Sequence, residues 1–587
     1  MPPSQDRMSR DWDEQGRDKQ DWDARDWDAV VVGAGLGGLT AAAYLATNGL
    51  RTLVLEQWSV AGGFSHVFRR RGFEFDVGVH YVGDCGPDGT IPTILRGVGL
   101  EGRVEFLPMD PDGFDTLVFP GLTFRVPRGW DRYLDALVEA FPGEERGLRE
   151  CIRVLRRVAL ECERAGMPET RAQAAAFVLR CPTAVHWSAR PLSELLDSCG
   201  LTPAARAVIC GQSGDYGAPP DVVPAAMHAA LLHHFLKSGT YFPRGGGQVL
   251  AANLIDVITA HGGQVRTGVR ADRILVSGGA VTGVRLRSGE VLSAPVVVSN
   301  AAIPRTYLEL VGSEHLPART LRKVGSYRMA PPFFIVYLGL DHDLATRMPN
   351  TNYWLHQDTE PGSFYRGVHP GRAGTPTPVG GLFISSATVK DPHSPHLAPP
   401  GHSTLQLMAF VPAHHSFWHL STGPAAGERY RRNAGYRAVK ERISQDMVRM
   451  ATQVLPDLRE HIVWEEAATP VTQERYTLAT GGSCLGLEVS TGQFGLHRPR
   501  ATTPVRGLYL TGAGTRSGPG VVGATTSGVI AAGAVLGRNL LAEVRGGRVF
   551  ADPALLGPRD EDRDALKASR NLRPASGPAA RADTLSN

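Results

Sequence analysis

One short segment restricts the folds open to this chain more than any other. It is the glycine-rich turn Gly33-Ala-Gly-Leu-Gly-Gly38, which directly follows four apolar residues. Residues 29–32 predict a buried parallel strand, residues 39–48 a helix and residues 51–55 a second strand. In such a β-α-β unit the glycines allow a tight turn, and the helix N-terminus offers N–H groups to a pyrophosphate. The segment therefore predicts a Rossmann-like dinucleotide-binding domain rather than a glycine turn that only packs.

An acidic residue ends the second predicted strand. Glu56 lies about 20 residues after Gly33, where a carboxylate can accept hydrogen bonds from the ribose hydroxyls of a dinucleotide. A phosphate on that ribose would be repelled, so we expect an adenosine without a 2′-phosphate.

Two further glycine-rich segments favour FAD over NAD. The pair Gly62-Gly63 follows Glu56 closely, as is typical of FAD enzymes of the glutathione-reductase type. Residues 511–525 form a second glycine-rich turn between a predicted strand and a helix, and such a segment can wrap the ribityl chain and direct a helix N-terminus toward the flavin. Gly512-x-Gly514 could also be interpreted as an NADPH site, but no second β-α-β unit with a ribose-binding residue follows.

Composition excludes several classes of protein. The chain has 587 residues, 42% hydrophobic and 20% charged, with a net charge of +4 and no block of like charge, which argues against disorder and against nucleic-acid binding. Seven dispersed cysteines without a C-x-x-C motif predict reduced thiols, neither a disulfide framework nor a zinc site. The sequence shows no secretory signal and no apolar run long enough to span a bilayer, so we expect a cytoplasmic protein.

The predicted elements fall into two domains of an α/β fold. We expect a Rossmann-like FAD-binding domain of the glutathione-reductase type that carries an inserted, mixed α+β substrate domain. The FAD-binding domain is predicted to be discontinuous, over residues 28–100, 241–300 and 461–545, and the substrate domain to comprise residues 101–240 and 301–460. Residues 1–27 are predicted to be a disordered tail and residues 546–587 a mostly disordered one.

Several motifs resemble the carotenoid desaturase and isomerase branch of FAD-dependent, amine-oxidase-like enzymes, and more closely the retinol saturase group. The resemblance extends over nearly all of residues 28–545. It is carried by Leu55-Glu-Gln57, Ala61-Gly-Gly63, residues 72–83, Tyr216-Gly-Ala-Pro-Pro220, Tyr241-Phe-Pro-Arg-Gly-Gly246, Val297-Val-Ser-Asn-Ala301, Thr351-Asn-Tyr353 and Leu508-Tyr-Leu-Thr-Gly512. Two departures stand out. Phe64 occupies a position where many relatives have Arg or Lys, and Gly518-Pro-Gly520 is more similar to the desaturases.

The glycine motifs and the resemblance together predict the FAD contacts. The resemblance implies that the backbone of Ala271 lies beside the adenine. It also implies FAD contacts from Val522, Gly523 and Ala524 at the start of the C-terminal helix. The predicted contacts are Gly33, Gly35, Leu36, Gly37, Gly38, Glu56, Gly62, Gly63, Ala271, Gly512, Val522, Gly523 and Ala524.

Two adjacent residues are candidates for acid–base chemistry. Reaction of a flavin with a C=C bond needs a proton added to, or removed from, the carbon beside the one that exchanges hydride. His80 and Tyr81 are the residues that could move it, since the resemblance places the segment after Asp76 near the flavin. Alternatively, His80 only fixes a loop by hydrogen bonding, and we expect Asp76 to hold backbone N–H groups.

Other polar residues suggest weaker roles. His228, His233 and His234 share a predicted helix, but their spacing does not suit a metal, and we predict none. They could line a substrate tunnel or simply pack. Arg244 could bind a substrate head group, with Tyr241 beside it, or be solvated or ion-paired.

These expectations combine into one favoured function and its alternatives. The favoured function is an FAD-dependent oxidoreductase acting on C=C bonds of a hydrophobic polyene or isoprenoid lipid, retinol- or carotenoid-like, with saturation favoured. The resemblance further implies an external electron donor or acceptor and peripheral contact with a membrane. The alternatives are a carotenoid desaturase or isomerase using the same flavin site, an amine oxidase, and a non-catalytic prenyl-binding protein of the same fold.

Overall fold

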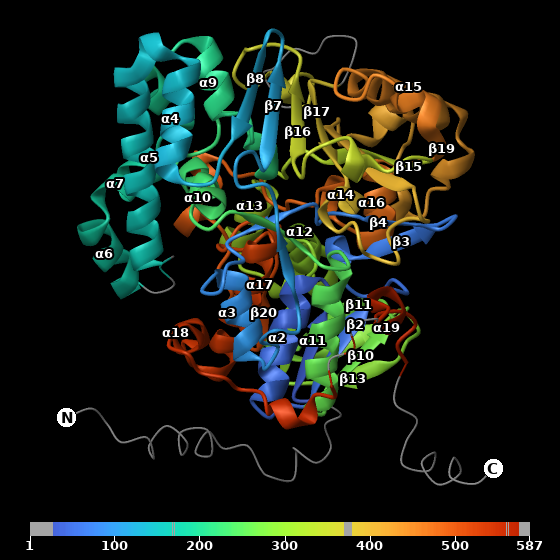
Figure 1. Ribbon diagram of the computed structural model, residues 1–587. Coiled ribbons are helices and arrows are strands. Elements are labelled where there is room, and N and C mark those ends of the chain that lie inside the picture. Colours follow the sequence, from blue (N-terminus) through green and yellow to red (C-terminus); the bar gives the residue numbers. More distant parts are fainter. Residues whose placement is uncertain are drawn as a thin grey trace.

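The computed structural model describes residues 27–166, 168, 171–368, 379–558, 560 and 563–573. Figure 1 shows two parts. A small parallel sheet between helices and a second, small sheet lies in the lower half, and a large sheet flanked by helices lies in the upper half. No helix among the described residues has both the length and the apolar character needed to cross a membrane.

The lower part is built on five parallel strands in the order β10-β2-β1-β14-β20. They are β1 (Ala29–Val32), β2 (Thr52–Glu56), β10 (Gln264–Thr267), β14 (Val296–Ser299) and β20 (Leu508–Leu510). The predicted strands and helix at the N-terminus are confirmed, with α2 covering Leu36–Thr47. Every residue of β1 is buried, because both faces of the sheet are covered.

Alternate residues of β1 enter two different cores. Ala29 and Val31 pack with three helices, α2, α11 (Gln248–Ala260) and α17 (Gly520–Leu536). Val30 and Val32 pack on the opposite face, toward an antiparallel sheet of β11 (Ala271–Ser277), β12 (Ala280–Leu286) and β13 (Val291–Ser293). This alternation follows from the two-residue period of a strand and fixes the first glycine turn at the carboxyl edge of the sheet.

The upper part contains a seven-stranded sheet in the order β19-β15-β18-β17-β16-β7-β8. Its strands are β7 (Asp115–Phe119), β8 (Leu122–Val126), β15 (Phe333–Leu340), β16 (Asn352–His356), β17 (Gly381–Ser385), β18 (Ser403–Phe410) and β19 (Ile462–Ala468). Side chains on one face pack with α15 (Ala434–Ala451). The other face packs with helices of the middle segment.

The middle segment, residues 130–236, is mostly helical. Its helices are α4 (Trp130–Ala140), α5 (Glu145–Ala165), α6 (Arg171–Arg180), α7 (Pro182–Ser188), α8 (Leu192–Ser198), α9 (Pro203–Ile209) and α10 (Ala225–Leu236).

The structure differs from the predicted domain limits in two places. Residues 462–468 form β19, which pairs with β15 in the large sheet, although they were assigned to the FAD-binding domain. Conversely, Ile303, Tyr307 and Val324 pack with β11 and β12. Strand pairing and apolar packing over long sequence separations decide both cases, and neither is visible in local composition.

The segment after residue 545 also differs from the expectation of a mostly disordered tail. Arg69 makes two hydrogen bonds with the carboxylate of Asp564, at 2.6 and 3.0 Å, and Ala61 N–H donates to the carbonyl of Ser569 at 3.0 Å. Leu566 is buried beside Val60. A few apolar residues within a charged stretch are sufficient to anchor it. Residues 1–26 and 574–587 of the predicted tails lie outside the described residues.

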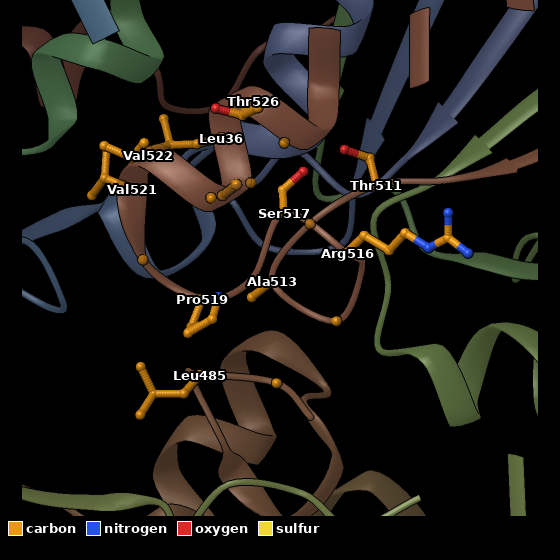
Figure 2. A pocket seen from close by; sticks show the side chains of 18 of the residues that line it. Leu36, Leu485, Thr511, Ala513, Arg516, Ser517, Pro519, Val521, Val522 and Thr526 are labelled. Atoms are coloured by element: carbon orange, nitrogen blue, oxygen red, sulfur yellow. The ribbon is translucent and has the colours of Figure 1, made fainter. Parts of the chain in front are cut away.

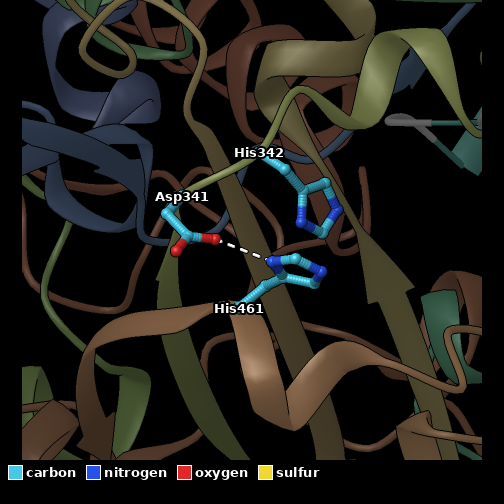
Figure 3. Close-up of side chains that lie close together, drawn as sticks. All are labelled: Asp341, His342 and His461. Carbon is cyan, nitrogen blue, oxygen red and sulfur yellow. Dashed lines mark hydrogen bonds and ion pairs between the residues drawn. The ribbon is translucent and has the colours of Figure 1, made fainter.

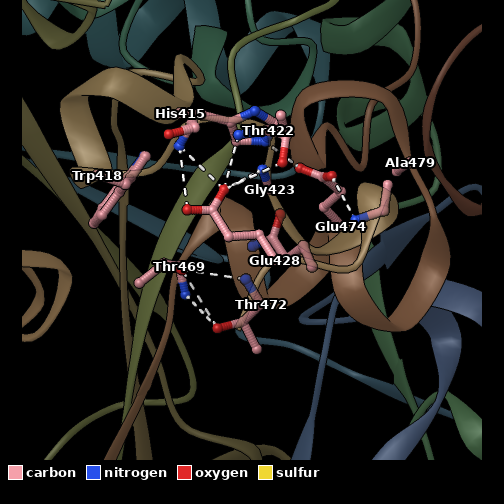
Figure 4. A network of polar contacts seen from close by, with 12 residues as sticks. His415, Trp418, Thr422, Gly423, Glu428, Thr469, Thr472, Glu474 and Ala479 are labelled. Carbon is pink, nitrogen blue, oxygen red and sulfur yellow. Dashed lines mark hydrogen bonds and ion pairs between the residues drawn. The ribbon is translucent and has the colours of Figure 1, made fainter. Parts of the chain in front are cut away.

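A polar network fixes α16 (Pro470–Thr477) next to the large sheet (Figure 4). His415 Nε2 lies 2.6 Å from Glu474 Oε2, and the other oxygen of Glu474 accepts the N–H of Ala425 at 3.1 Å. A capping box between Thr469 and Thr472 begins the helix. The network matters for the site because Gln473 and other residues of this segment line the cavity described below.

Candidate functional site

The two glycine-rich turns, far apart in the sequence, meet at the carboxyl edge of the parallel sheet. A Cβ atom placed on Gly37 would lie 2.9 Å from the backbone nitrogen of Gly512. One on Gly528 of α17 would lie 2.6 Å from the carbonyl oxygen of Gly37. The two helices that follow the turns therefore pack backbone against backbone, and their N-termini open toward the same space.

The first turn and the second glycine pair form a cradle. A Cβ atom on Gly63 would lie 2.9 Å from Cα of Gly35, and Gly63 has a φ of +59°. Helix α2 begins at Gly35 without a capping side chain, so its first N–H groups stay available for a ligand. Gly38 serves packing instead, because a Cβ atom there would lie 2.1 Å from the carbonyl oxygen of Gly33. This cradle fits the pyrophosphate of a dinucleotide.

Glu56 stands beside the cradle. It is 8% exposed, and its two carboxylate oxygens accept the N–H groups of Ala34 at 3.0 Å and Trp58 at 2.9 Å. Burial raises the pKa of this carboxyl, which these hydrogen bonds partly oppose. Each oxygen keeps a lone pair that could accept a ribose hydroxyl. The position and chemistry fit the predicted role.

The second turn forms another wall of the same space. Figure 2 shows residues from Thr511 to Pro519 running into α17, with Leu485 on the opposite side. Helix α17 also begins without a capping side chain, after Pro519. Its N-terminus can therefore stabilise negative charge on a group held between the walls.

A single cavity of about 2100 Å³ joins these elements to an apolar chamber. The predicted residues that line it are His80, Tyr81, Gly33, Gly35, Leu36, Gly37, Glu56, Gly62, Gly63, Ala271, Gly512, Val522, Gly523 and Ala524. The chamber walls on the large sheet are Phe333, Ile335, Trp354, Phe383 and Met408. The structure thus brings the predicted cofactor and acid–base residues together.

Two predicted substrate residues are not part of this lining. Arg244 is paired with Glu105 at 2.7 and 2.9 Å, and Tyr241 donates its hydroxyl to the carbonyl of Ser238 at 2.9 Å. Neither side chain reaches the cavity wall. Tyr241 lies in β9 (Thr240–Pro243) and Arg244 follows it; β9 pairs with β5 (Val82–Gly83) and β6 (Phe106–Pro108).

His80 lies in the cavity wall without a hydrogen-bond partner. It is 8% exposed, and neither ring nitrogen has a partner among the described residues. Burial, with a smaller contribution from the charge of Lys390, lowers its pKa to about 3. His80 is therefore neutral at physiological pH, and both of its ring nitrogens are enclosed by the surrounding side chains, with Gln406 close enough to oppose the fall in pKa.

Tyr81 also lines the cavity, and its hydroxyl contacts two carboxylates. The oxygen is 2.8 Å from Oδ2 of Asp215 and 3.1 Å from Oδ2 of Asp115. Burial and these two acidic groups raise its pKa well above the usual range, so the phenol keeps its proton. Asp115 is buried behind Tyr81, whereas Asp215 is itself part of the cavity wall.

Behind these residues lies a buried polar cluster that sequence analysis missed in part. Lys390 donates hydrogen bonds to Asn352 and Ser385, each at 2.6 Å, and burial lowers its pKa to about 7. Asp76 accepts the N–H of Gly247 at 2.6 Å, as expected, and burial raises its pKa to about 7. The cluster draws on β4 (Phe73–Asp76), β7, β16 and α14 (Ala387–Lys390), so no single motif reveals it.

The three histidines of α10 have separate environments. His228 Nδ1 contacts the hydroxyl of Tyr216 at 3.1 Å, His233 contacts Trp130 and Glu163, and His234 accepts the N–H of Gly83 at 3.0 Å. His233 and His234 line the cavity. A different group, Asp341, His342 and His461, brings possible metal ligands together at the surface (Figure 3). There His461 is bonded to Asp341 at 2.8 Å, and Arg347 lies 3.5 Å from His342.

Comparison with known proteins agrees with this geometry. The family model described as flavin containing amine oxidoreductase matches residues 36–536. The chain is 31% identical to all-trans-retinol 13,14-reductase of Macaca fascicularis, over 89% of this chain and 88% of that protein. It is 27% identical to prolycopene isomerase 1 of an Oncidium hybrid cultivar, over 86% and 83%. Cyclohexylamine oxidase from Brevibacterium oxydans shares the fold, with a TM-score of 0.56 at 17% identity, over 88% of this chain and 99% of that one.

The fold and the cradle define an FAD-dependent oxidoreductase. The chain belongs to the flavin-containing amine oxidoreductase family, within the superfamily of carotenoid desaturases and retinol saturases. The predictions of FAD as cofactor and of an oxidoreductase are thereby confirmed.

Proposed function

We propose that this protein saturates a C=C bond in a hydrophobic polyene or isoprenoid lipid, with a retinol- or carotenoid-like substrate. The observation that carries the proposal is the continuity of one cavity from the glycine cradle to a chamber whose walls on the large sheet are apolar, with His80 and Tyr81 beside Phe383. A long apolar ligand gains free energy by entering such a chamber. The five-stranded sheet would be an FAD-binding domain of the glutathione-reductase type, and the large sheet with its helices the inserted substrate domain.

In this proposal the chain holds FAD through the two turns and the start of each following helix. Glu56 would bind the adenosine ribose, and backbone of Ala271 would lie beside the adenine. Bound FAD supplies the two-electron chemistry, with electrons exchanged with an external donor or acceptor. The chain's own contribution is to orient the polyene against its apolar walls, to exclude water and to provide a proton.

Tyr81 is the residue we propose as proton donor. Its phenol lines the cavity and keeps its proton across the physiological range. His80, which is neutral, would turn a ring nitrogen toward the bound molecule and fix its position. This assignment divides the two predicted catalytic residues into a donor and an orienting group.

The similarity to the macaque reductase supports saturation, and the similarity to prolycopene isomerase supports isomerisation as a second candidate. The test is anaerobic incubation of the photoreduced holoenzyme with all-trans-retinol, with prolycopene or with a linear carotene. Mass spectrometry of the extracted lipid then distinguishes the reactions. A product two hydrogens heavier, formed as the flavin reoxidises, is the expected result. A geometric isomer of unchanged mass, or no change with any polyene, contradicts saturation.

We extend the proposal to the route of the substrate. Ala176 and Phe177 of α6 line the cavity, while Val178 and Leu179 on the same helix are 55% and 83% exposed. Large apolar side chains exposed at the mouth of an apolar cavity suit insertion into the surface of a bilayer. Lipid substrates would then pass from the membrane to the chamber without crossing water.

A further inference from the structure

The hydroxyl of Tyr81 has one proton to donate, but two carboxylate oxygens lie within hydrogen-bonding distance of it. Its hydroxyl lies 2.8 Å from Asp215 Oδ2 and 3.1 Å from Asp115 Oδ2. Asp115 is buried, whereas Tyr81 and Asp215 are half-buried in the cavity wall. A phenol can donate only one hydrogen bond. If both acids were ionised, one carboxylate would face the phenol oxygen without a proton between them, at a distance where repulsion is strong. One of the two acids must therefore carry the second proton.

The surroundings decide which acid carries it. Asp115 accepts hydrogen bonds from the side-chain amides of Gln212 at 2.5 Å and Asn352 at 3.0 Å, and the charge of Lys390 acts on it. These donors stabilise an ionised carboxylate. Within the described part of the chain, the carboxyl group of Asp215 makes a hydrogen bond with Tyr81 only.

Electrostatics point the same way. Burial, and then the negative charge of Asp115, raise the pKa of Asp215 well above the usual range, whereas the pKa of Asp115 rises only to about 6. The other titratable groups coupled to Asp215 are the phenols of Tyr216 and Tyr365, which are neutral because burial raises their pKa values. No cation acts on Asp215 among the contributions to its pKa.

We infer that Asp215 is a protonated carboxylic acid that donates its hydrogen bond to Tyr81, while Tyr81 donates to the carboxylate of Asp115, so that Asp215 holds a second, replacement proton for the site. The inference rests on the proposed function for its role in turnover. It adds to that function a positioning residue which acts through Tyr81 and which also forms part of the cavity wall.

The proton balance of this relay is simple. In saturation the π bond of the substrate breaks and two C–H bonds form. One would take a hydride supplied by reduced FAD, and the other takes the proton released as the O–H bond of Tyr81 breaks. The O–H bond of Asp215 then breaks and its proton passes to the phenolate oxygen of Tyr81, which leaves Asp215 as a carboxylate. Asp215 takes a new proton from water once the product has left the cavity. Without Asp215, a phenolate would stand beside the ionised Asp115 at the end of each turnover.

Infrared spectroscopy of the oxidised holoprotein tests the protonation state without any substrate. The band is recorded above pH 8, where Asp76, whose pKa is about 7, is ionised. The expected result is a carboxylic-acid C=O band that shifts on exchange into ²H₂O and disappears in Asp215→Asn. Asp391→Asn is the matched control. Asp391 is a buried aspartate that accepts the N–H of Gly245 and lies outside the cavity wall, so the band should survive its replacement. A band that is unchanged in Asp215→Asn overturns the inference.

A pH titration of the wild-type band and a turnover measurement complement the infrared spectrum of Asp215→Asn. If Asp215→Asn does not fold, the pH at which the wild-type band disappears gives the answer. We expect the band to persist above pH 8, far above the ordinary aspartate range, and its loss near pH 4 overturns the inference. In turnover, Asp215→Asn should lower kcat roughly tenfold or more with little change in KM and should move the pH profile. Because the infrared result needs no substrate, a failure of the proposed polyene reaction is distinguishable from a failure of this inference.

Discussion

Gly37 and Gly512 lie so close together that a methyl group on Gly37 would stand 2.9 Å from the backbone nitrogen of Gly512. The contact joins the first turn of the nucleotide-binding domain to the last one. It leaves no room for a side chain in the place where the cofactor's two halves are expected to meet.

We therefore predict that Gly37→Ala weakens FAD binding. Alanine favours a helix over glycine, by roughly 1 kcal/mol, but here its methyl group must push two backbone turns apart. FAD affinity should fall at least roughly tenfold, about 1.4 kcal/mol, as measured by flavin fluorescence on dilution. Gly143→Ala is the control, because a Cβ atom there meets nothing within 4 Å. Equal retention of flavin by both variants would show that the two turns do not act together.

Asp76 should make the protein less stable as the pH rises. Its pKa is about 7 in the folded chain, against an ordinary value of 3.8, because it is buried. Between these values the folded chain binds a proton that the unfolded chain has released, so the free energy of unfolding falls as the pH rises from about 4 to about 7. Lys390, with its lowered pKa of about 7, acts oppositely and only above that range.

Asp76→Asn should flatten this dependence. The amide can still accept the N–H of Gly247, but it does not titrate. Chemical denaturation at several pH values should show a decline for the wild type on the order of a few kcal/mol, and a smaller one for the variant. Parallel curves for the two proteins would mean that Asp76 is ionised throughout.

We predict that His80 positions the bound substrate and that its own titration does not affect turnover. Since its pKa is about 3, turnover between pH 5 and pH 8 should show no step that disappears in His80→Gln. His80→Leu, which removes both ring nitrogens, should lower kcat/KM roughly 10²-fold while flavin content stays normal. Full turnover by the leucine variant would remove His80 from the mechanism.

Two neighbouring residues of β17 separate the substrate chamber from the rest of the core. Phe383 lines the cavity and lies 5.8 Å from the ring of His80, whereas Ile384 packs on the opposite face with α15. Phe383→Leu should raise KM for polyenes several-fold. Ile384→Val should cost about 1 kcal/mol of stability and leave KM unchanged. Steady-state kinetics with polyenes of two lengths, with unfolding curves for both variants, checks the distinction.

Membrane contact through α6 should depend on two side chains. Replacing Val178 and Leu179 by serine should lower binding to phospholipid vesicles at least roughly tenfold, since burying a large apolar side chain contributes about 2 kcal/mol. Val291→Ser is the control, as Val291 is 55% exposed on β13 and does not line the cavity. Co-sedimentation with vesicles measures the difference. If both proteins bind alike, α6 is not the contact.

The sequence predicts the nucleotide-binding half well because its determinants are local. The first turn, Glu56 and the strand before them are contiguous, and each has a role that backbone geometry imposes. The chamber is different. Asp215 precedes the motif Tyr216-Gly-Ala-Pro-Pro220 by one residue, and Asp115 follows a turn at the start of β7. Nothing in either segment indicates that both meet Tyr81, since the contacts join residues that lie 34 and 134 positions apart in the sequence.

Arg244 is a different case, because the sequence left open whether it binds a ligand or is ion-paired, and the structure shows an ion pair. Its place in a glycine-rich motif suggested a ligand, but Glu105 lies beside it in space and engages the guanidinium. An ion pair between residues that are distant in the sequence cannot be predicted from the spacing of residues within a motif.

The segment of residues 563–573 gives the protein a link between its far end and its nucleotide cradle. Ser569 holds the N–H of Ala61, directly before the glycine pair, and Leu572 holds the N–H of Thr267 in β10. Local unfolding of this segment would therefore also destabilise the loop that carries Gly62 and Gly63. By linkage, FAD bound at that loop would stabilise the segment against unfolding. Resistance of this segment to a protease would therefore report how much of the protein has FAD bound. A protein fused after the segment would change the affinity for FAD.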